Sequence, residues 1–187
     1  QPVFLLNVPS TWQTKAARNY YAEELKRLGR FLSSLGGSKP SPAMLAETMR
    51  LFDTARNKLR QVRRSSPGAS FSAALAEFNS KGIPELTLPK NALTPRGIPV
   101  AVLGGPILQN DRVLFQWIEE AGGNVALDGT ENGERGFPDP FRNERLNCDP
   151  FDELVHAYFD VIPDPSRRPN SGLYVWLKRE IEERKIQ

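Results

Sequence analysis

The segment covering residues 100–129, VAVLGGPILQNDRVLFQWIEEAGGNVALDG, most constrains the fold of this chain. An apolar run at 100–103 is followed by a Gly-Gly-Pro turn, by apolar residues at helical spacing over 111–121, and by a second apolar run at 124–128. Two strands that are connected by one helix in this way lie parallel to each other in the sheet, and the crossover between them is right-handed. The segment therefore predicts an α/β fold class with a parallel, Rossmann-like β-α-β half. The core face of its helix is expected to be Val113, Leu114, Trp117, Ile118 and Ala121.

Helical patterns precede this unit. Residues 14–35 carry apolar side chains at helical spacing and end at a Gly-Gly pair, and a second helix is expected over 41–64, with Ser41 as N-cap. The short connection predicts a long antiparallel helix pair. A third, shorter helix is expected over 71–78, and the apolar run Val3 to Pro9 looks like a short strand. The residues expected to be buried between the paired helices or against the α/β part are Leu25, Leu28, Phe52 and Leu59.

The pattern also suggests a domain organisation. Residues 1–80 form a helical connecting region, and 81–99 is a linker, because its prolines, including Pro99, disfavour both helix and central strand. Residues 100–187 begin an α/β domain, with further helices at about 150–159 and 172–185. The chain opens with glutamine and ends on a helix where an α/β chain usually continues, so we expect a fragment of a longer protein.

Charge and cysteine content exclude several classes. The 25 basic and 22 acidic residues are interspersed, so no footprint for nucleic acid is evident, and Arg60, Arg63 and Arg64 are interpreted as cations at a helix end. No apolar run approaches the roughly 18 residues of a membrane span. The single cysteine, Cys148, excludes an internal disulfide or a site built from several thiolates of this chain. These features fit a cytoplasmic protein without a membrane or nucleic-acid partner.

Two loops follow the expected strands. Gly104, Gly105 and Pro106 do not match the dinucleotide or triphosphate patterns, so a structural turn is the simpler interpretation of the first loop. The second loop carries Asp128, Glu131, Glu134 and Arg135 at the sheet edge where α/β proteins bind ligands, and it opens a long, polar, turn-rich stretch. A solvated loop is again the simpler interpretation.

Isolated residues offer less. His156, the only histidine, lies in an expected helix without evident triad or metal partners, and Cys148 has no nearby basic residue at helical spacing. Trp12, Trp117 and Trp176 are interpreted as core or interface anchors. None of these residues alone predicts a reaction.

The order of several segments is more specific. LLNVPSTWQTKAARNYYAEELKRLGRFL, KPSPAMLAETMRLFDTARNKLRQVRRS, IPVAVLGGPI with WIEEAGGNVALDGTENGERGF, and HAYFDVIPDPSRRPNSGLYVWLKREIEERKI follow one another over nearly the whole chain. In this order they resemble the 2-hydroxyacyl-CoA dehydratase D-component and benzoyl-CoA reductase subunit family. The most specific elements are the Val-Pro after the opening run, the G-x-P-I loop, the I-E-E-x-G-G-x-V passage and the G-x-R at Gly133 to Arg135.

The resemblance implies a cytoplasmic iron-sulfur lyase or reductase. In that family an α/β subunit holds a [4Fe-4S] cluster through three cysteines, pairs with a homologous second subunit, and receives electrons from an ATP-dependent activator. The reaction dehydrates a 2-hydroxyacyl-CoA or reduces an aromatic acyl-CoA. Two places where relatives carry cysteine read DGTENGER and FDVIPDPS here, the latter with Asp164. This chain alone is therefore expected neither to bind the cluster nor to be active.

The resemblance and the sheet edge together predict a site. The loops Gly104 to Asn110 and Asp128 to Arg135 are expected to face each other and to form one wall of an acyl-CoA or cluster cavity. Arg135 is the expected anion-binding residue, with Glu131 and Glu134 as its partners. The residues expected to line the cavity are Gly104, Gly105, Pro106, Asn110, Asp128, Glu131 and Arg135. The alternative is a non-catalytic scaffold or subunit-interaction module.

Overall fold

The computed structural model describes residues 2–81 and 96–186, which form two compact units. Unit 1 contains residues 1–50 and 138–173, and unit 2 contains residues 51–137 and 174–187. The division therefore falls within two helices, α2 (Pro42–Ser65) and α7 (Ser171–Arg184). The predicted division into 1–80, 81–99 and 100–187 stays a prediction, because most of the predicted linker lies outside the described residues.

Unit 2 contains a two-stranded parallel sheet. β1 (Ile98–Leu103) pairs with β2 (Gly123–Gly129), and the register shifts by one residue after Val100. α4 (Val113–Glu120) connects them and follows the 3-10 turn η1 (Gln109–Arg112), so the predicted helix over 111–121 begins as a tighter turn. The β-α-β pattern is confirmed. Pro99 lies inside β1, which begins two residues earlier than predicted. Among the described residues β2 is the one strand that pairs with β1, so β1 is an edge strand, where proline is tolerated, and not the central strand that the prolines were expected to exclude.

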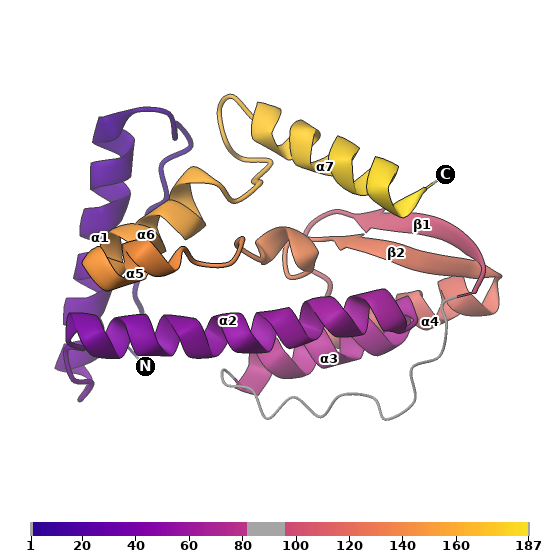
Figure 1. Ribbon diagram of the computed structural model, residues 1–187, viewed down its shortest axis with the longest axis horizontal. Coiled ribbons are helices and arrows are strands. Elements are labelled where there is room, and N and C mark those ends of the chain that lie inside the picture. The colour runs from indigo at the N-terminus through magenta and orange to yellow at the C-terminus, as the bar shows by residue number, and fades with distance from the viewer. Residues whose placement is uncertain (1, 82–95, 187) are drawn as a thin grey trace. The chain divides into compact units, whose positions relative to one another are not determined.

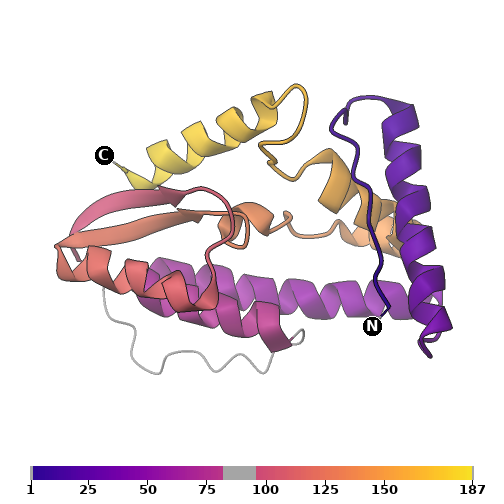
Figure 2. The same ribbon diagram turned by 180° about the vertical axis from the view of Figure 1, so that it is seen from behind.

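Helices cover both faces of this sheet. In Figure 1 and Figure 2, α3 (Gly68–Lys81) and α4 lie on one side of the strands, and the part of α7 (Ser171–Arg184) that belongs to unit 2 lies on the other. α3 approaches the sheet closely, because a Cβ atom at Gly68 would lie 2.6 Å from Cβ of Val125. Glycine is therefore required for this packing. The buried core includes Leu59, Val62, Phe71, Ala74 and Leu75.

The face of α4 that packs inward differs from the predicted one. Phe115 is buried, and Glu119 accepts a hydrogen bond from the backbone N–H of Ala69 in α3 at 2.8 Å. Trp117, which was predicted to anchor the core, is 59 % exposed. The cause is tertiary, since α3 and β2 both pack against α4 and select the face that carries Phe115.

Unit 1 is helical. It contains α1 (Lys15–Ser34), the first part of α2 (Pro42–Ser65), α5 (Asn143–Cys148), α6 (Pro150–Val155), the π-helical segment η3 (His156–Asp160) and the start of α7. Thr14 and Ser41 cap α1 and α2 through their hydroxyl oxygens. α1 packs on α6 and η3, where Tyr21 stacks on Phe159 with 4.8 Å between ring centroids.

The predicted antiparallel pairing of the first two helices is not confirmed. Leu25 of α1 packs with the Tyr21 and Phe159 cluster, whereas Leu59 of α2 is fully buried with Phe71 of α3. Leu28 and Phe52 are only half-buried. Each helix therefore finds its main apolar partners elsewhere, although both helices form close to their predicted bounds.

The opening segment is not a strand. Residues 2–9 form neither helix nor strand, and Val3 and Leu5 are 88 % and 72 % exposed. Among the described residues no neighbouring strand pairs with this segment; the N–H of Asn7 instead donates to Glu24 at 2.9 Å. A strand pattern without a sheet partner does not form a strand.

Candidate functional site

The loops that follow β1 and β2 contact each other. The N–H of Glu131 donates to the carbonyl of Gly105 at 3.4 Å. The Asn132 side chain accepts from the N–H of Ile107 at 3.0 Å and donates to its carbonyl at 2.8 Å. Parallel strands bring their carboxyl ends to the same edge of a sheet, which places these loops together. The Asn132 side chain thus bridges the two loops. Sequence reasoning missed this role, because the only signal was an amide side chain in a turn-rich stretch.

The predicted cavity residues differ in exposure. The first loop presents Gly104, Gly105, Pro106 and Asn110 at the surface, and Asn110 lies in η1. In the second loop Glu131 is exposed, whereas Asp128 and Arg135 are buried. Hydrogen bonds join Gly104 and Gly105 to the second loop, and none of the hydrogen bonds given for the described residues joins Pro106 or Asn110 to it.

Asp128 organises the second loop from within. Its Oδ1 accepts hydrogen bonds from the backbone N–H and the hydroxyl of Thr130, at 3.2 and 2.6 Å. The loop then folds back so tightly that a Cβ atom at Gly133 would lie 2.3 Å from the same oxygen. The carboxylate of Asp128 is therefore committed to building the turn.

Arg135 is a buried cation with little compensation. Arg135 is 8 % exposed, and its Nη2 donates to the Gly104 carbonyl at 3.4 Å. Its Nε is buried without a hydrogen-bond partner among the described residues. A buried charge is costly unless it is paired. Arg135 therefore retains a donor and a positive charge next to the first loop.

The carboxylate of Glu134 does not pair with Arg135, contrary to the prediction. Its Oε1 binds Nε of Arg63 at 2.9 Å and accepts the N–H of Asp128 at 3.0 Å, while its Oε2 binds Nη1 of Arg184 at 2.7 Å. Arg184 also binds Glu180 at 2.6 Å. We call Arg63, Glu134, Glu180 and Arg184 the Glu134 cluster. Glu131, the other expected partner, is exposed.

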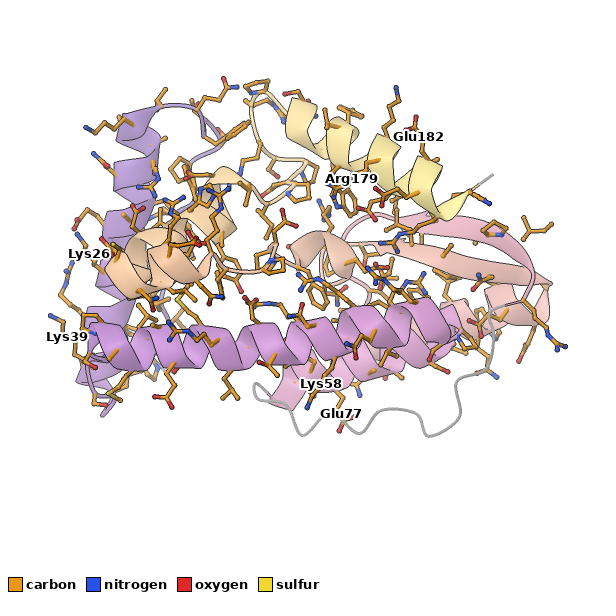
Figure 3. All side chains as sticks on the ribbon, viewed as in Figure 1. Lys26, Lys39, Lys58, Glu77, Arg179 and Glu182 are labelled. Atoms are coloured by element: carbon orange, nitrogen blue, oxygen red, sulfur yellow. The ribbon has the colours of Figure 1, made fainter. Side chains whose placement is uncertain are left out.

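The Glu134 cluster also ties helices to the sheet. Arg63 of α2 donates to the carbonyl of Val125, and Arg184 of α7 donates to that of Ala126 at 2.7 Å. The sequence suggested only that Arg63 is a cation at the end of α2. The structure shows that it also binds Glu134 and a carbonyl of β2. Figure 3 shows Glu182 on the outer side of α7, where its carboxylate is exposed, whereas Glu180 is buried.

Burial and pairing act in opposite directions on the two arginines of the Glu134 cluster. Burial lowers the pKa of Arg63 below its ordinary value, and attraction to Glu134 offsets only part of this. Burial also lowers the pKa of Arg184, but the carboxylates of Glu134 and Glu180 together outweigh it and raise the pKa above its ordinary value. Glu134 is therefore shared by two cations, Arg63 and Arg184, and the cluster has a structural role.

Two other residues singled out in the sequence lie in unit 1. Nδ1 of His156 lies 3.0 Å from Oδ2 of Asp160, and this carboxylate also binds Nε of Arg18 at 3.0 Å. Cys148 is exposed at the end of α5. Within residues 2–81 and 96–186, no group of three or more His, Cys, Asp or Glu side chains could hold a metal ion.

No helix in the described ranges has the length and apolarity required to cross a membrane. Comparison with curated proteins gives no match. The model of the family described as 2-hydroxyglutaryl-CoA dehydratase, D-component, matches residues 1–187. With the collinear segments and the parallel β-α-β unit, this match over the whole chain shows that the protein belongs to the 2-hydroxyglutaryl-CoA dehydratase D-component family.

Proposed function

We propose that this chain forms part of a subunit that dehydrates a 2-hydroxyacyl-CoA or, as in benzoyl-CoA reductases, reduces an aromatic acyl-CoA. The family match over residues 1–187 carries the dehydratase assignment. The proposed partners are a homologous second subunit and an ATP-dependent activator. Within the chain, the loops Gly104 to Asn110 and Asp128 to Arg135 form one wall of the acyl-CoA cavity, at the sheet edge where α/β proteins bind ligands.

Arg135 is the residue proposed to bind an anionic group of the substrate. The observation that carries this role is its burial with an unpartnered Nε and without an ion pair to Glu134, whose carboxylate is held by Arg63 and Arg184. A guanidinium presents a planar fork that suits phosphate or carboxylate. Gly104 and Gly105, which carry no side chains, leave the backbone beside Arg135 accessible to a ligand.

The family's [4Fe-4S] cluster does not fit the residues of this chain alone. The sequence contains one cysteine, Cys148, and the described residues contain no group of metal ligands around it. Thiolates are the usual ligands of such clusters. We therefore propose that any cluster ligands lie outside these 187 residues, in a longer protein of which this chain is a fragment, and we assign no step of the reaction to the cluster.

The same observation favours a second candidate function, a non-catalytic scaffold or subunit-interaction module of a diverged family member. The iron content of the complete protein, purified without oxygen, separates the two. Stoichiometric iron and sulfide in the protein would support the enzyme. A stably folded protein that lacks iron after reconstitution, with no acyl-CoA turnover, would support the scaffold.

The role of Arg135 is tested by Arg135→Ala in the complete protein with its partners. We expect acyl-CoA binding to weaken by about tenfold or more, because a hydrogen bond to a charged group is lost. Arg135→Gln serves if the alanine variant folds poorly, since it retains a donor for the Gly104 carbonyl. Arg64→Ala, which removes an exposed arginine from the end of α2, is the matched control. Unchanged acyl-CoA binding in a folded Arg135 variant would show that these loops have only a structural role.

A further inference from the structure

A second buried arginine, Arg167 in unit 1, has more unpartnered hydrogen-bond donors than Arg135. Arg167 is 5 % exposed, and both its Nε and its Nη1 are buried without a hydrogen-bond partner among the described residues. Its guanidinium carbon lies 4.3 Å from the ring centroid of Phe159, so the ring covers one face of the cation. An aromatic face attracts the charge but accepts no conventional hydrogen bond.

Arg167 lines a small cavity. Other walls come from Trp12, from the segment Asp160 to Asp164, and from Asn170 and Gly172, all within unit 1. The cavity volume is about 40 Å³. On the same measure a single buried water needs roughly 10–15 Å³. A small oxyanion fits this space, whereas a nucleotide or an acyl-CoA does not.

The cavity wall adds a second source of positive potential. Gly172 and Leu173, in the first turn of α7, are part of the lining, and α7 is a 14-residue helix. The N–H of Leu173 already donates to the Asn170 carbonyl at 3.1 Å, but the aligned peptide dipoles of the helix still leave partial positive charge at this end, which favours an anion. The start of α7 and Arg167 therefore border the same space.

The carboxylates near Arg167 do not fully neutralise it. Asp160 is shared by Arg18 and His156, and Oδ1 of Asp164 accepts the N–H of Ser166 at 2.7 Å. Burial lowers the pKa of Arg167 below its ordinary value, and attraction to Asp164 and Asp160 offsets only part of that effect. Water could satisfy the free donors, but it would not compensate the buried charge.

We propose that this cavity binds a small oxyanion, carboxylate or phosphate, through the Arg167 guanidinium at the start of α7. Trp12 closes one side of the space, and its indole N–H is already donated to the Pro169 carbonyl at 2.8 Å, so it contributes shape and not a hydrogen bond to the ligand. The site lies in unit 1 and is independent of the proposed role of Arg135 in unit 2.

The test is titration of the full chain with inorganic phosphate and, separately, with acetate, each against chloride at constant ionic strength. Calorimetry reports the binding, and thermal unfolding reports the stabilisation that a ligand of the folded state produces. We expect saturable binding of one anion per chain. The tighter of the two arms identifies the ligand as phosphate or carboxylate.

Arg167→Met is expected to weaken this binding by about tenfold or more, while its unbranched side chain still packs on Phe159. Arg30→Met, which removes an exposed arginine of α1, is the matched control and should bind as the unmodified chain does. Asp164→Asn keeps an oxygen for the Ser166 N–H and removes a competing charge, so it should tighten binding several-fold and serves if Arg167→Met does not fold.

The proposal is overturned if neither anion binds saturably to the unmodified chain. It is also overturned if folded Arg167→Met binds as tightly as Arg30→Met, or if Asp164→Asn leaves the affinity unchanged or weaker.

Discussion

The two units each contain a network of arginines and carboxylates, and the networks differ in burial. In unit 2, the side chains of Arg63 and Glu134 are 9 % and 11 % exposed. In unit 1, Asp152 binds Arg18 at 2.7 Å and Arg145 at 2.9 Å, but these three side chains are 28 to 39 % exposed. We call Arg18, Arg145 and Asp152 the Asp152 cluster.

The comparison shows that the same chemistry has different consequences at different depths. Removing one partner of a buried ion pair leaves an uncompensated charge, whereas water replaces the lost partner of an exposed pair. The Glu134 cluster also binds backbone carbonyls of β2, so it holds α2 and α7 against the strand that carries the candidate site. The Asp152 cluster joins helices near the surface of unit 1.

The largest expected effect is that of Glu134→Gln. This change leaves Arg63 and Arg184 without their shared carboxylate, and the free energy of unfolding should fall by about 3–5 kcal/mol. Chemical denaturation measures it. Glu131→Gln, in the same loop but exposed, should change stability by less than about 0.5 kcal/mol. Equal effects of the two variants would mean that burial does not separate the networks.

The apolar cores sharpen the same contrast. Leu59→Ala removes a fully buried side chain from the core of unit 2 and should cost about 2–5 kcal/mol. Leu28→Ala, on the half-buried face of α1, should cost clearly less. Thermal unfolding of both variants checks the order. A larger loss for Leu28→Ala would instead support the predicted packing of α1 along α2.

A small effect is expected for Asp152→Asn. Because all three side chains of the Asp152 cluster are partly exposed, the loss should be about 0.2–1 kcal/mol. Urea denaturation at neutral pH measures it, with Glu23→Gln as a control at an exposed ion pair of α1. A loss comparable to that of Glu134→Gln would contradict the distinction between the two networks.

The pH dependence of this small effect has a defined sign. Burial alone would raise the pKa of Asp152, but hydrogen bonds from Arg18 and Arg145 more than compensate, and the pKa lies below its ordinary value of 3.8. The stabilisation is therefore present above the unfolded-state pKa and is lost as the pH falls through the folded-state pKa. The difference between the unmodified chain and Asp152→Asn should shrink progressively below about pH 4. A difference that grows in acid would show that the pKa is raised instead.

Local sequence was sufficient for most of the secondary structure. Helices near 14–35 and 41–64 and the parallel β-α-β unit could be predicted because their signals are local: the Ser41 cap, the apolar spacing and the glycine-marked turns. The family could be predicted from the order of segments. The contact between the two loops could also be anticipated, since parallel strands end at one edge.

Tertiary structure decided which faces and charges pair, because these depend on residues far apart in the chain. Nothing local indicates that Glu134 pairs with Arg63 and Arg184 in preference to the adjacent Arg135. The same is true of Phe115, which is buried in place of Trp117 because α3 and β2 select that face of α4. The burial of Arg167 against Phe159 requires the fold of unit 1. Sequence periodicity determines where helices and strands form, while burial, which sets the energy of a charge, exists only after distant segments have packed.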